Sequence, residues 1–427
     1  MKSFPVQVLI LVVLLPFATL TQAGEQVLTL EQAIMQVQRH PSLLASRANA
    51  EALSFKPAQV SGLPDPVLSL GALSFPVDTF KRNQENMTQL QVGISQAFPF
   101  PGTLDLAAQA DAHLAEAAKL DTDEMRLQLI NQVQHSWWNL FYLDRALEAV
   151  AHNKQLLKQL VKVAESKYKT GKGLQQDVLL AQLELSKLLD IEIQLTSSRA
   201  QEAVRLNQLL NQPSEHVIRL PKEASADLPT LPEATALMRQ AMRFRPLLAK
   251  QQQLIEAAEA KVSLADKAYY PDFKLGASYG VRAGNPNTGV DRADLASVSL
   301  SVTLPFFSDV QDASLGMQQA NLAKQGFAYE DAKQAVMAEI AQAKASYAQN
   351  KAQVALFKSG IIPQAQQTVA SMRAAYQVNR VDFLNLMRAQ ITLYNYETQY
   401  WKALAGAKQA LARLDAAVGK TMENTYE

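Results

Sequence analysis

The chain carries nearly the same pattern of residues twice. Residues 41–71 match residues 246–276 at a constant offset of 205, so that Gly71 corresponds to Gly276. Later matches occur at offsets of 206 and 208, and they are Ser95 with Ser301, Pro99 with Pro305, Tyr168 with Tyr376, Ala181 with Ala389 and Gln182 with Gln390. Because the offset grows by only three residues over about 200, the chain is predicted to contain two copies of one structural unit.

The first residues have the pattern of a secretory signal peptide. Lys2 precedes an apolar run at residues 6–15, Pro16 interrupts that run, and residues 21–23 offer a cleavage site. We therefore expect residues 1–23 to be removed. A membrane anchor is the alternative interpretation, but the run is shorter than the ~20 apolar residues that a spanning helix needs. No later stretch has that apolar length, so the chain is predicted to be exported without a helical membrane segment.

Composition argues against several classes of function. The chain has no cysteine, which excludes disulfides and thiolate metal sites, and its formal net charge of +1 gives no global attraction for nucleic acid. The histidines lack the i, i+4 spacing of a helical metal site, and they are His40, His113, His135, His152 and His216. No phosphate-binding loop or nucleophile elbow is present. We therefore expect no catalytic residue, no cofactor and no resident metal.

The longest helical pattern lies between Pro101 and Gly171. This segment has no internal proline and is rich in strong helix formers. As a single helix it would extend for ~100 Å at 1.5 Å per residue. Aromatic residues within 137–142 are expected to pack in a core at the broad part of the molecule, rather than to bind a substrate. A tight turn at residues 171–173 then reverses the chain, which returns along residues 174–212.

The second copy repeats this arrangement. Residues 308–377 form the outgoing helix, with Pro363 as one expected bend, residues 379–380 reverse the chain, and residues 381–418 return. Such long hairpins need partners along their sides to bury apolar surface, and a soluble coiled coil is one way to supply them. The predicted organisation is a signal peptide at 1–23, a first repeat at 24–212 with its helical hairpin at 102–212, a Pro-rich linker at 213–231, a second repeat at 232–418 with its hairpin at 308–418, and a tail at 419–427.

Four segments of strict apolar and polar alternation lie outside the helices. They predict strands at about 66–76, 88–99, 271–282 and 294–305, each close to the length of a tilted strand that crosses a bilayer. We predict that one face of these strands contacts lipid through Leu68, Leu70, Val92, Ile94, Phe273, Leu275, Tyr279, Val298, Leu300 and Val302. The opposite face carries mainly Ser, Thr, Gly, Gln and Lys, which suits a water-filled lumen. A half-buried strand of a soluble sandwich would show the same alternation, but the chain has no other β material to complete such a core.

Four strands cannot close a barrel, and open sheet edges are not tolerated in hydrocarbon. Several chains must therefore share one barrel. The loops at residues 76–86 and 282–294 are rich in Asn, Asp, Gly and Pro, so we expect them on the external side. The helices leave the sheet from the opposite end and are expected to lie in the periplasm.

The chain resembles the TolC-like outer-membrane efflux protein family. The resemblance depends on the strand entries at Pro66 and Pro271, and on the strand exit at residues 95–102 with its copy at 301–307. It also depends on a helical turn with the pattern Tyr-x-x-Gly followed by Asp and Ala-Gln at residues 168–182, which has a copy at 376–390. The order, spacing and duplication of these motifs cover essentially the whole mature chain.

The resemblance implies a mainly α-helical protein with membrane β-structure. Duplicated helical hairpins would form a periplasmic tunnel, and the four strands of each chain would contribute to a trimeric 12-stranded β-barrel in the outer membrane of a Gram-negative cell. The implied function is a passive exit duct of a tripartite efflux system. The implied partners are two further copies of the chain, a periplasmic adaptor, an inner-membrane pump of the RND type and outer-membrane lipid. The alternative function is a periplasmic coiled-coil adaptor or scaffold without a pore.

The resemblance also assigns the periplasmic gate and adaptor contact to the two helical turns. The matching residues are Gly171, Lys172, Gly173, Leu174, Asp177, Asn379, Arg380, Val381, Asn385 and Arg388. An ion pair between Asp177 and Arg380 is one hypothesis for keeping the gate shut, and a solvated turn with both charges free is the other. Some members carry two aspartates where this chain has Asn385 and Arg388, so an acidic ring is not expected. Arg388 would repel cations if it faces the lumen, or it would contact a neighbouring helix.

The strand entry at residues 64–66 and the exit at 96–102 are most similar to the CzcC-like and CusC-like heavy-metal branch of this family. That similarity implies heavy-metal cations as one possible cargo. The residues themselves name neither the cargo nor the partner pump.

Overall fold

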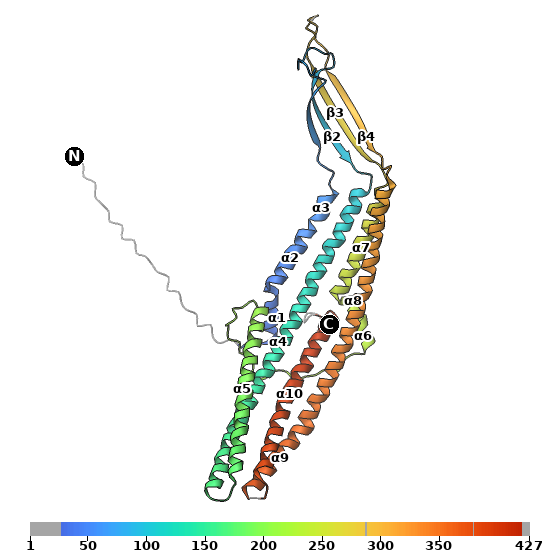
Figure 1. Ribbon diagram of the computed structural model, residues 1–427. Helices are drawn as coiled ribbons and strands as arrows, with labels where there is room; N and C mark the ends of the chain where they lie inside the picture. Colours follow the sequence, from blue (N-terminus) through green and yellow to red (C-terminus); the bar gives the residue numbers. More distant parts are fainter. Residues whose placement is uncertain (1–26, 287, 379, 421–427) are drawn as a thin grey trace, which may run out of the picture.

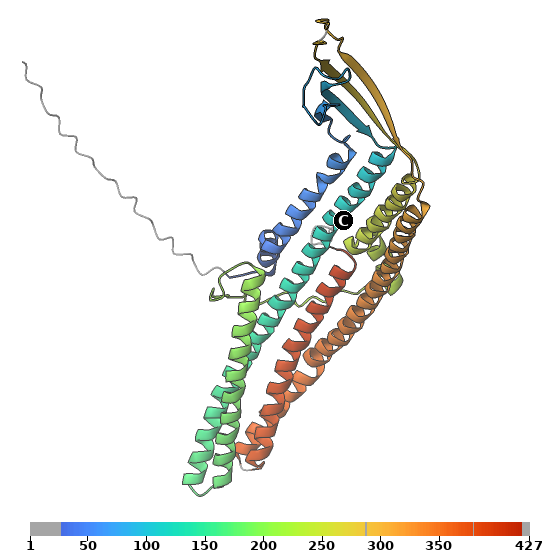
Figure 2. The same cartoon turned by 45° about the horizontal axis from the view of Figure 1, so that its top comes forward.

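The computed structural model describes residues 27–286, 288–378 and 380–420. The predicted signal peptide, most of the predicted C-terminal tail and Asn379 lie outside the described residues. The described chain is a long rod with a β-sheet at one end and two helical reversals at the other (Figure 1). A view turned by 45° shows the same elongated shape (Figure 2).

Each repeat contains a hairpin of long helices. In the first repeat, α4 (Thr103–Lys169) is a single helix of 67 residues and α5 (Gln175–Leu209) returns beside it. In the second repeat, α8 (Ser308–Leu356) and α9 (Ile362–Gln377) form the outgoing arm and α10 (Phe383–Ala417) returns.

The outgoing arm of the second repeat is interrupted by one π-helical turn, Phe357–Ile361. Pro363 follows this turn after one residue, Ile362. A proline has no N–H to donate to the carbonyl one turn earlier, and its ring crowds that carbonyl, so a widened turn relieves both problems. The predicted bend at Pro363 therefore takes the form of a π-bulge.

Shorter helices lead from the waist of the rod to the sheet. The first repeat contains α1 (Leu30–Gln36), a 3-10 turn η1 (Val37–Arg39), α2 (Pro41–Ser54) and α3 (Lys56–Ser61), whereas the second contains α6 (Ala234–Phe244) and α7 (Pro246–Lys267). Both α2 and α7 begin with proline at the first helical position, where its missing N–H would have no helical partner. The matched sequences of the two copies therefore begin at the same structural position, the first residue of α2 and of α7.

The four strands form one antiparallel sheet in the order β1-β2-β3-β4. They are β1 (Val67–Leu73), β2 (Gln89–Phe98), β3 (Asp272–Arg282) and β4 (Leu295–Thr303). The central pair, β2 and β3, joins the two repeats, with Val92 opposite Tyr279 and Ile94 opposite Ala277. Strands β1 and β4 each have only one neighbour, so both outer edges of the sheet are open in the described chain.

The main hydrophobic core lies at the waist, where the linker between the repeats crosses the helices. Trp137 and Phe141 of α4 stack with ring centroids 5.6 Å apart, and both are almost fully buried. The indole N–H of Trp137 donates to the carbonyl of Leu28 at 3.1 Å. The linker is held by side chains, because Arg199 donates to the carbonyl of Ile218 at 3.0 Å and Tyr347 donates to that of Pro229 at 2.6 Å. The aromatic segment therefore has the predicted core position.

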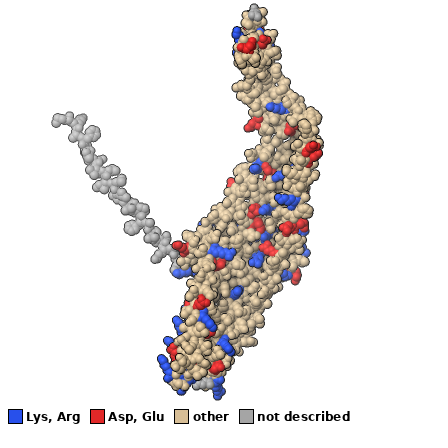
Figure 3. All heavy atoms as spheres, viewed as in Figure 1, with Lys and Arg blue, Asp and Glu red and all other residues tan. Residues whose placement is uncertain are grey.

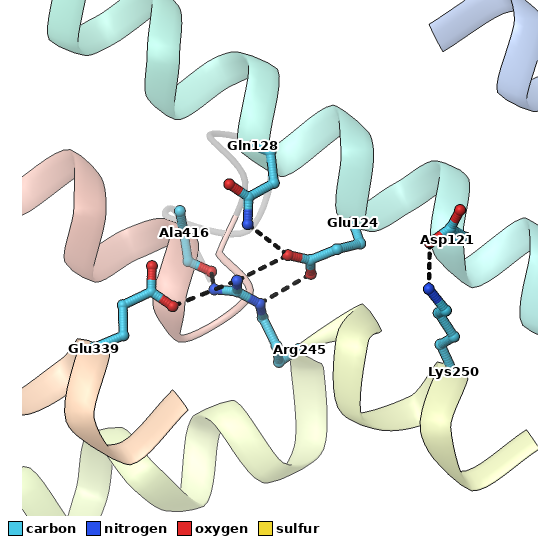
Figure 4. Close-up of polar contacts among 7 residues, drawn as sticks. All are labelled: Asp121, Glu124, Gln128, Arg245, Lys250, Glu339 and Ala416. Atoms are coloured by element: carbon cyan, nitrogen blue, oxygen red, sulfur yellow. Dashed lines mark hydrogen bonds and ion pairs between the residues drawn. The ribbon is translucent and has the colours of Figure 1, made fainter. Parts of the chain in front are cut away.

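Four helices meet at a buried ion pair above the waist (Figure 4). Arg245, at the N-cap of α7, is 2% exposed and donates to the two carboxylate oxygens of Glu124 on α4 at 2.9 and 2.8 Å. The same guanidinium donates to the carbonyl of Ala416 at the end of α10 and lies 3.5 Å from the carboxylate of Glu339 on α8. Gln128 donates to Glu124 at 2.8 Å, which satisfies the carboxylate further. Arg245 thus links the first repeat to three helices of the second.

Candidate functional site

The sheet presents one continuous apolar face. The pairing aligns Leu70 with Val92 and Val92 with Tyr279 across three strands, and Leu275 with Leu300 across the last two. Leu70 is 79% exposed and Val298 is 81% exposed, although large aliphatic side chains are normally buried. Of the ten residues predicted to face lipid, Phe273 is half-buried and the other nine are exposed, namely Leu68, Leu70, Val92, Ile94, Leu275, Tyr279, Val298, Leu300 and Val302. Their placement on one exposed face is what a lipid contact requires, and the contact itself stays a prediction.

The opposite face of the sheet is polar and closely packed. The side-chain amide of Gln91 donates to the hydroxyl of Ser278 at 2.6 Å, and the hydroxyl of Ser69 donates to the carbonyl of Gly93 at 3.3 Å. A Cβ atom at Gly93 would lie 2.9 Å from the Ser69 hydroxyl, so the position leaves no room for a side chain. Gly93 and Gly280 are buried on this face, and Lys274 places a charge on it.

Charged side chains are sparse over the sheet and gather at its outer loops (Figure 3). The two loops are joined to each other, because Arg292 donates to the carbonyls of Asn83 and Glu85 at 3.2 and 3.1 Å. Arg282 donates to the carbonyl of Asn86 at 3.2 Å. An uncharged apolar band bordered by a polar cap therefore occupies this end of the rod. Among the helices of the described residues, none combines the length and the apolar character needed to cross a membrane.

The opposite end of the rod is formed by the two helical reversals, which lie side by side in both ribbon views (Figures 1 and 2). A hydrophobic cluster holds the two hairpins together, and its buried members are Leu157, Ala164, Ala181, Tyr376, Phe383, Leu386 and Met387. Farther from the tip, the amide of Gln390 on α10 donates to Asn153 on α4 at 2.7 Å in a buried contact. The two hairpins of one chain thus form a single packed unit.

The predicted tip residues lie at these reversals, with one outside the described residues. Gly171 has a φ of 69°, and the N–H of Lys172 donates to the carbonyl of Lys167 at 2.8 Å, which is the pattern of a glycine-terminated helix. Lys172, Leu174, Arg380, Asn385 and Arg388 are exposed, whereas Gly173, Asp177 and Val381 are half-buried. Asn379 lies outside the described residues.

The structure does not pair Asp177 with Arg380 within one chain. Among the ion pairs of the described residues, neither of these two side chains takes part. Asp177 lies in the first turn of α5, where its carboxylate interacts favourably with the helix dipole. An ion pair between neighbouring chains stays a prediction.

The contact that does join the tips was not predicted. The ammonium of Lys167 donates to the backbone carbonyl of Tyr376 at 2.7 Å and lies 3.9 Å from the centre of the Tyr376 ring. Burial raises the pKa of the Tyr376 hydroxyl, and the nearby Asp177 carboxylate raises it further. The duplicated tyrosine was visible in the sequence, but its partner is 209 residues away and follows only from how the hairpins pack. Among the described residues, no group of three or more His, Cys, Asp or Glu side chains could hold a metal ion.

Comparison with known proteins gives a consistent result. The family model described as Outer membrane efflux protein matches residues 34–212 and 237–420, which include both repeats. The cobalt-zinc-cadmium resistance protein CzcC of Cupriavidus metallidurans is 21% identical over 366 residues, covering 85% of this chain and 82% of that protein.

Solved structures show the same fold at low sequence identity. The outer-membrane channel OprN superimposes with a TM-score of 0.77 and 19% identity, over 92% of this chain and 90% of the OprN chain. CusC, whose structure is described in terms of folding and transmembrane channel formation, gives a TM-score of 0.77 and 17% identity, over 92% of each chain. The duplicated hairpins and the four-stranded sheet are therefore a known architecture.

Proposed function

Because the chain belongs to the outer membrane efflux protein family, we propose that it forms the exit duct of a tripartite efflux system. In this proposal three copies of the chain share one β-barrel in the outer membrane. Their helical hairpins continue the passage as a tunnel through the periplasm. A periplasmic adaptor meets the tips of the hairpins, and an inner-membrane pump of the RND type supplies the energy. The duct itself conducts passively and needs no catalytic group.

The observation that carries this proposal is the sheet with two open edges and one apolar face. Unpaired backbone groups at both edges are unfavourable in lipid unless another strand covers them. The duplication suggests which strands pair, because β4 is the copy of β2 and β1 is the copy of β3. If β4 pairs with β1 of the next chain as β2 pairs with β3, then Ser301 lies opposite Gly71, as Ser95 lies opposite Gly276.

This inter-chain register also keeps the two faces separate. It places Leu300 opposite Ala72, as Ile94 lies opposite Ala277 within the chain. Apolar residues then meet apolar residues, and small polar residues meet small polar residues, all around the ring. A shift by one residue would mix the faces, since successive side chains point to opposite sides of a strand.

The tips are the proposed gate. In the assembly, Asp177 of one chain would pair with Arg380 of its neighbour, since the two do not pair within one chain. An exposed ion pair contributes only about 0–1 kcal/mol, so three of them could hold a gate shut and still release it. Exchanging Asp177 for Arg should increase conductance and drug leakage, whereas an unchanged closed conductance would exclude the pair.

Heavy-metal ions are the cargo suggested by the likeness to CzcC, whose name assigns it to cobalt, zinc and cadmium resistance. Deletion of the gene should then lower tolerance to these metals more than tolerance to organic drugs. The opposite order would assign the duct to drug efflux.

Purification in detergent tests the duct directly. We expect the protein to require detergent, to have the mass of three chains, and to conduct ions after insertion into planar lipid bilayers. A protein that stays soluble without detergent and does not conduct would support a periplasmic adaptor or scaffold instead.

A further inference from the structure

One face of α10 is polar from the tip toward the waist. Residues at helical spacing along this row are all polar and all exposed, namely Asn385, Arg388, Thr392, Asn395 and Gln399. The buried side chains of the same helix, including Leu386 and Gln390, lie on the opposite side, against α4 and α9. Most of the row therefore points away from the packed unit of the two hairpins, and Asn395 borders a cavity lined by α4, α5 and α10.

The exposed face of α5 carries a different kind of side chain from the polar row of α10. It carries large aliphatic residues that the described chain leaves uncovered, and these are Leu179, Leu183, Leu189 and Ile193, with exposed fractions of 57%, 52%, 42% and 69%. Exposed Ser186 and Asp190 lie among these aliphatic side chains. In an assembly of several chains, the aliphatic side chains gain from burial against a neighbour, whereas a fully polar row gains nothing from such burial. The contrast assigns α5 to the contact between chains and the α10 row to water.

Arg388 is the charged member of the α10 row. It lies about one turn from the start of α10, close to the narrow end of the rod, and it takes part in no ion pair among the described residues. The acidic residue nearest to Arg388 in the sequence is Asp382, at the N-cap of α10, and its carboxylate accepts a hydrogen bond from the N–H of Asn385 at 3.0 Å. The α10 row itself contains no acidic residue.

We infer that Arg388 lines the water-filled passage near its periplasmic mouth and makes the channel prefer anions to cations. This inference rests on the proposed function, because three chains bring three guanidinium groups around one opening. At low salt their fields are only weakly screened, since the Debye length is ~10 Å at 0.1 M. The ring opposes bare divalent cations, so a metal cargo would pass as a neutral or anionic complex.

The test is the reversal potential of the purified full-length protein in planar lipid bilayers under a tenfold gradient of dilute KCl. We expect the wild-type channel to prefer chloride. Arg388→Glu should shift the chloride-to-potassium permeability ratio about tenfold toward potassium, and Arg388→Gln should shift it about threefold. Arg373→Glu is the matched control, because Arg373 is also exposed on this hairpin but lies on α9 beside the seam between the hairpins. It should change the ratio less than about twofold.

Each outcome distinguishes this inference from the proposed function. A channel that conducts but prefers potassium would refute the inference and leave the duct intact. Equal shifts for Arg373→Glu and Arg388→Glu would also refute it, because the selectivity would then come from the general charge of the tip. If the Arg388→Glu protein fails to assemble, the chloride-to-potassium permeability ratio of the Arg388→Gln channel decides whether the inference holds. Absence of conductance in every variant would refute the duct, and the selectivity with it.

Discussion

The buried ion pair between Arg245 and Glu124 gives the sharpest prediction about stability. Replacing Arg245 with Ala would leave Glu124, which is 8% exposed, as an uncompensated carboxylate among four helices. Removal of one partner of a buried ion pair costs about 3–5 kcal/mol. The upper part of that range is expected here, because Arg245 also satisfies the carbonyl of Ala416 and approaches Glu339.

The matched control is the double variant Glu124→Gln with Arg245→Met. It removes both charges together, so its loss should be much smaller than that of Arg245→Ala, since no unpaired charge is buried. The assay is guanidinium unfolding followed by circular dichroism, at fixed protein and detergent concentrations because stability depends on assembly. A loss below ~1 kcal/mol for Arg245→Ala, or an equal loss for both variants, would refute the reasoning.

Three further predictions concern other parts of the rod. Burial raises the pKa of Asp415 from 3.8 to about 6, so the carboxyl group binds its proton more tightly in the folded chain than in the unfolded chain, and the folded chain loses stability as the pH rises from about 4 to 6. Asp415→Asn should remove that loss and raise the free energy of unfolding at pH 7 by up to ~3 kcal/mol, measured by unfolding from pH 4 to pH 7. In the sheet, Leu300→Arg should cost about 2–4 kcal/mol in folding into lipid vesicles, whereas Ser299→Arg on the other face should cost much less, and equal costs would contradict a lipid-facing Leu300. At the tip, Lys167→Met should accelerate hydrogen exchange in the hairpin ends, because it removes the contact to Tyr376, and unchanged exchange would show that the contact contributes nothing.

Local periodicity was enough to predict most of the fold. The alternation in residues 89–98 and 272–282 predicted the strands and their two faces, because a strand repeats every two residues whatever it packs against. The absence of proline predicted the single helix α4, and Pro363 predicted the interruption of the second arm. Each of these features is determined by residues close together in the chain.

Contacts between distant residues were not predictable in this way. Tyr168 and Tyr376 occupy the same place in the duplicated motif, yet Tyr168 is 48% exposed and Tyr376 is 5% exposed. The difference arises because the two hairpins pack against each other asymmetrically, which no local pattern encodes. The same holds for Arg245 and Glu124, which are 121 residues apart, and for the linker, whose course is set by hydrogen bonds such as that from Arg199 to Ile218.

The most direct test of the shared barrel is a disulfide between its outer strands. The chain has no natural cysteine, so the double variant Gly71→Cys with Ser301→Cys contains only the two thiols of interest. Gly71 has room for the new side chain, since a Cβ atom there would meet nothing closer than Leu73 at 3.8 Å. Oxidation of cells that express this variant should yield covalent trimers on a non-reducing gel, while Gly71→Cys with Ser297→Cys, four residues out of register, should stay monomeric. Failure of the first pair to cross-link in correctly inserted protein, or equal cross-linking of both pairs, would contradict a barrel built from β1 and β4 of neighbouring chains.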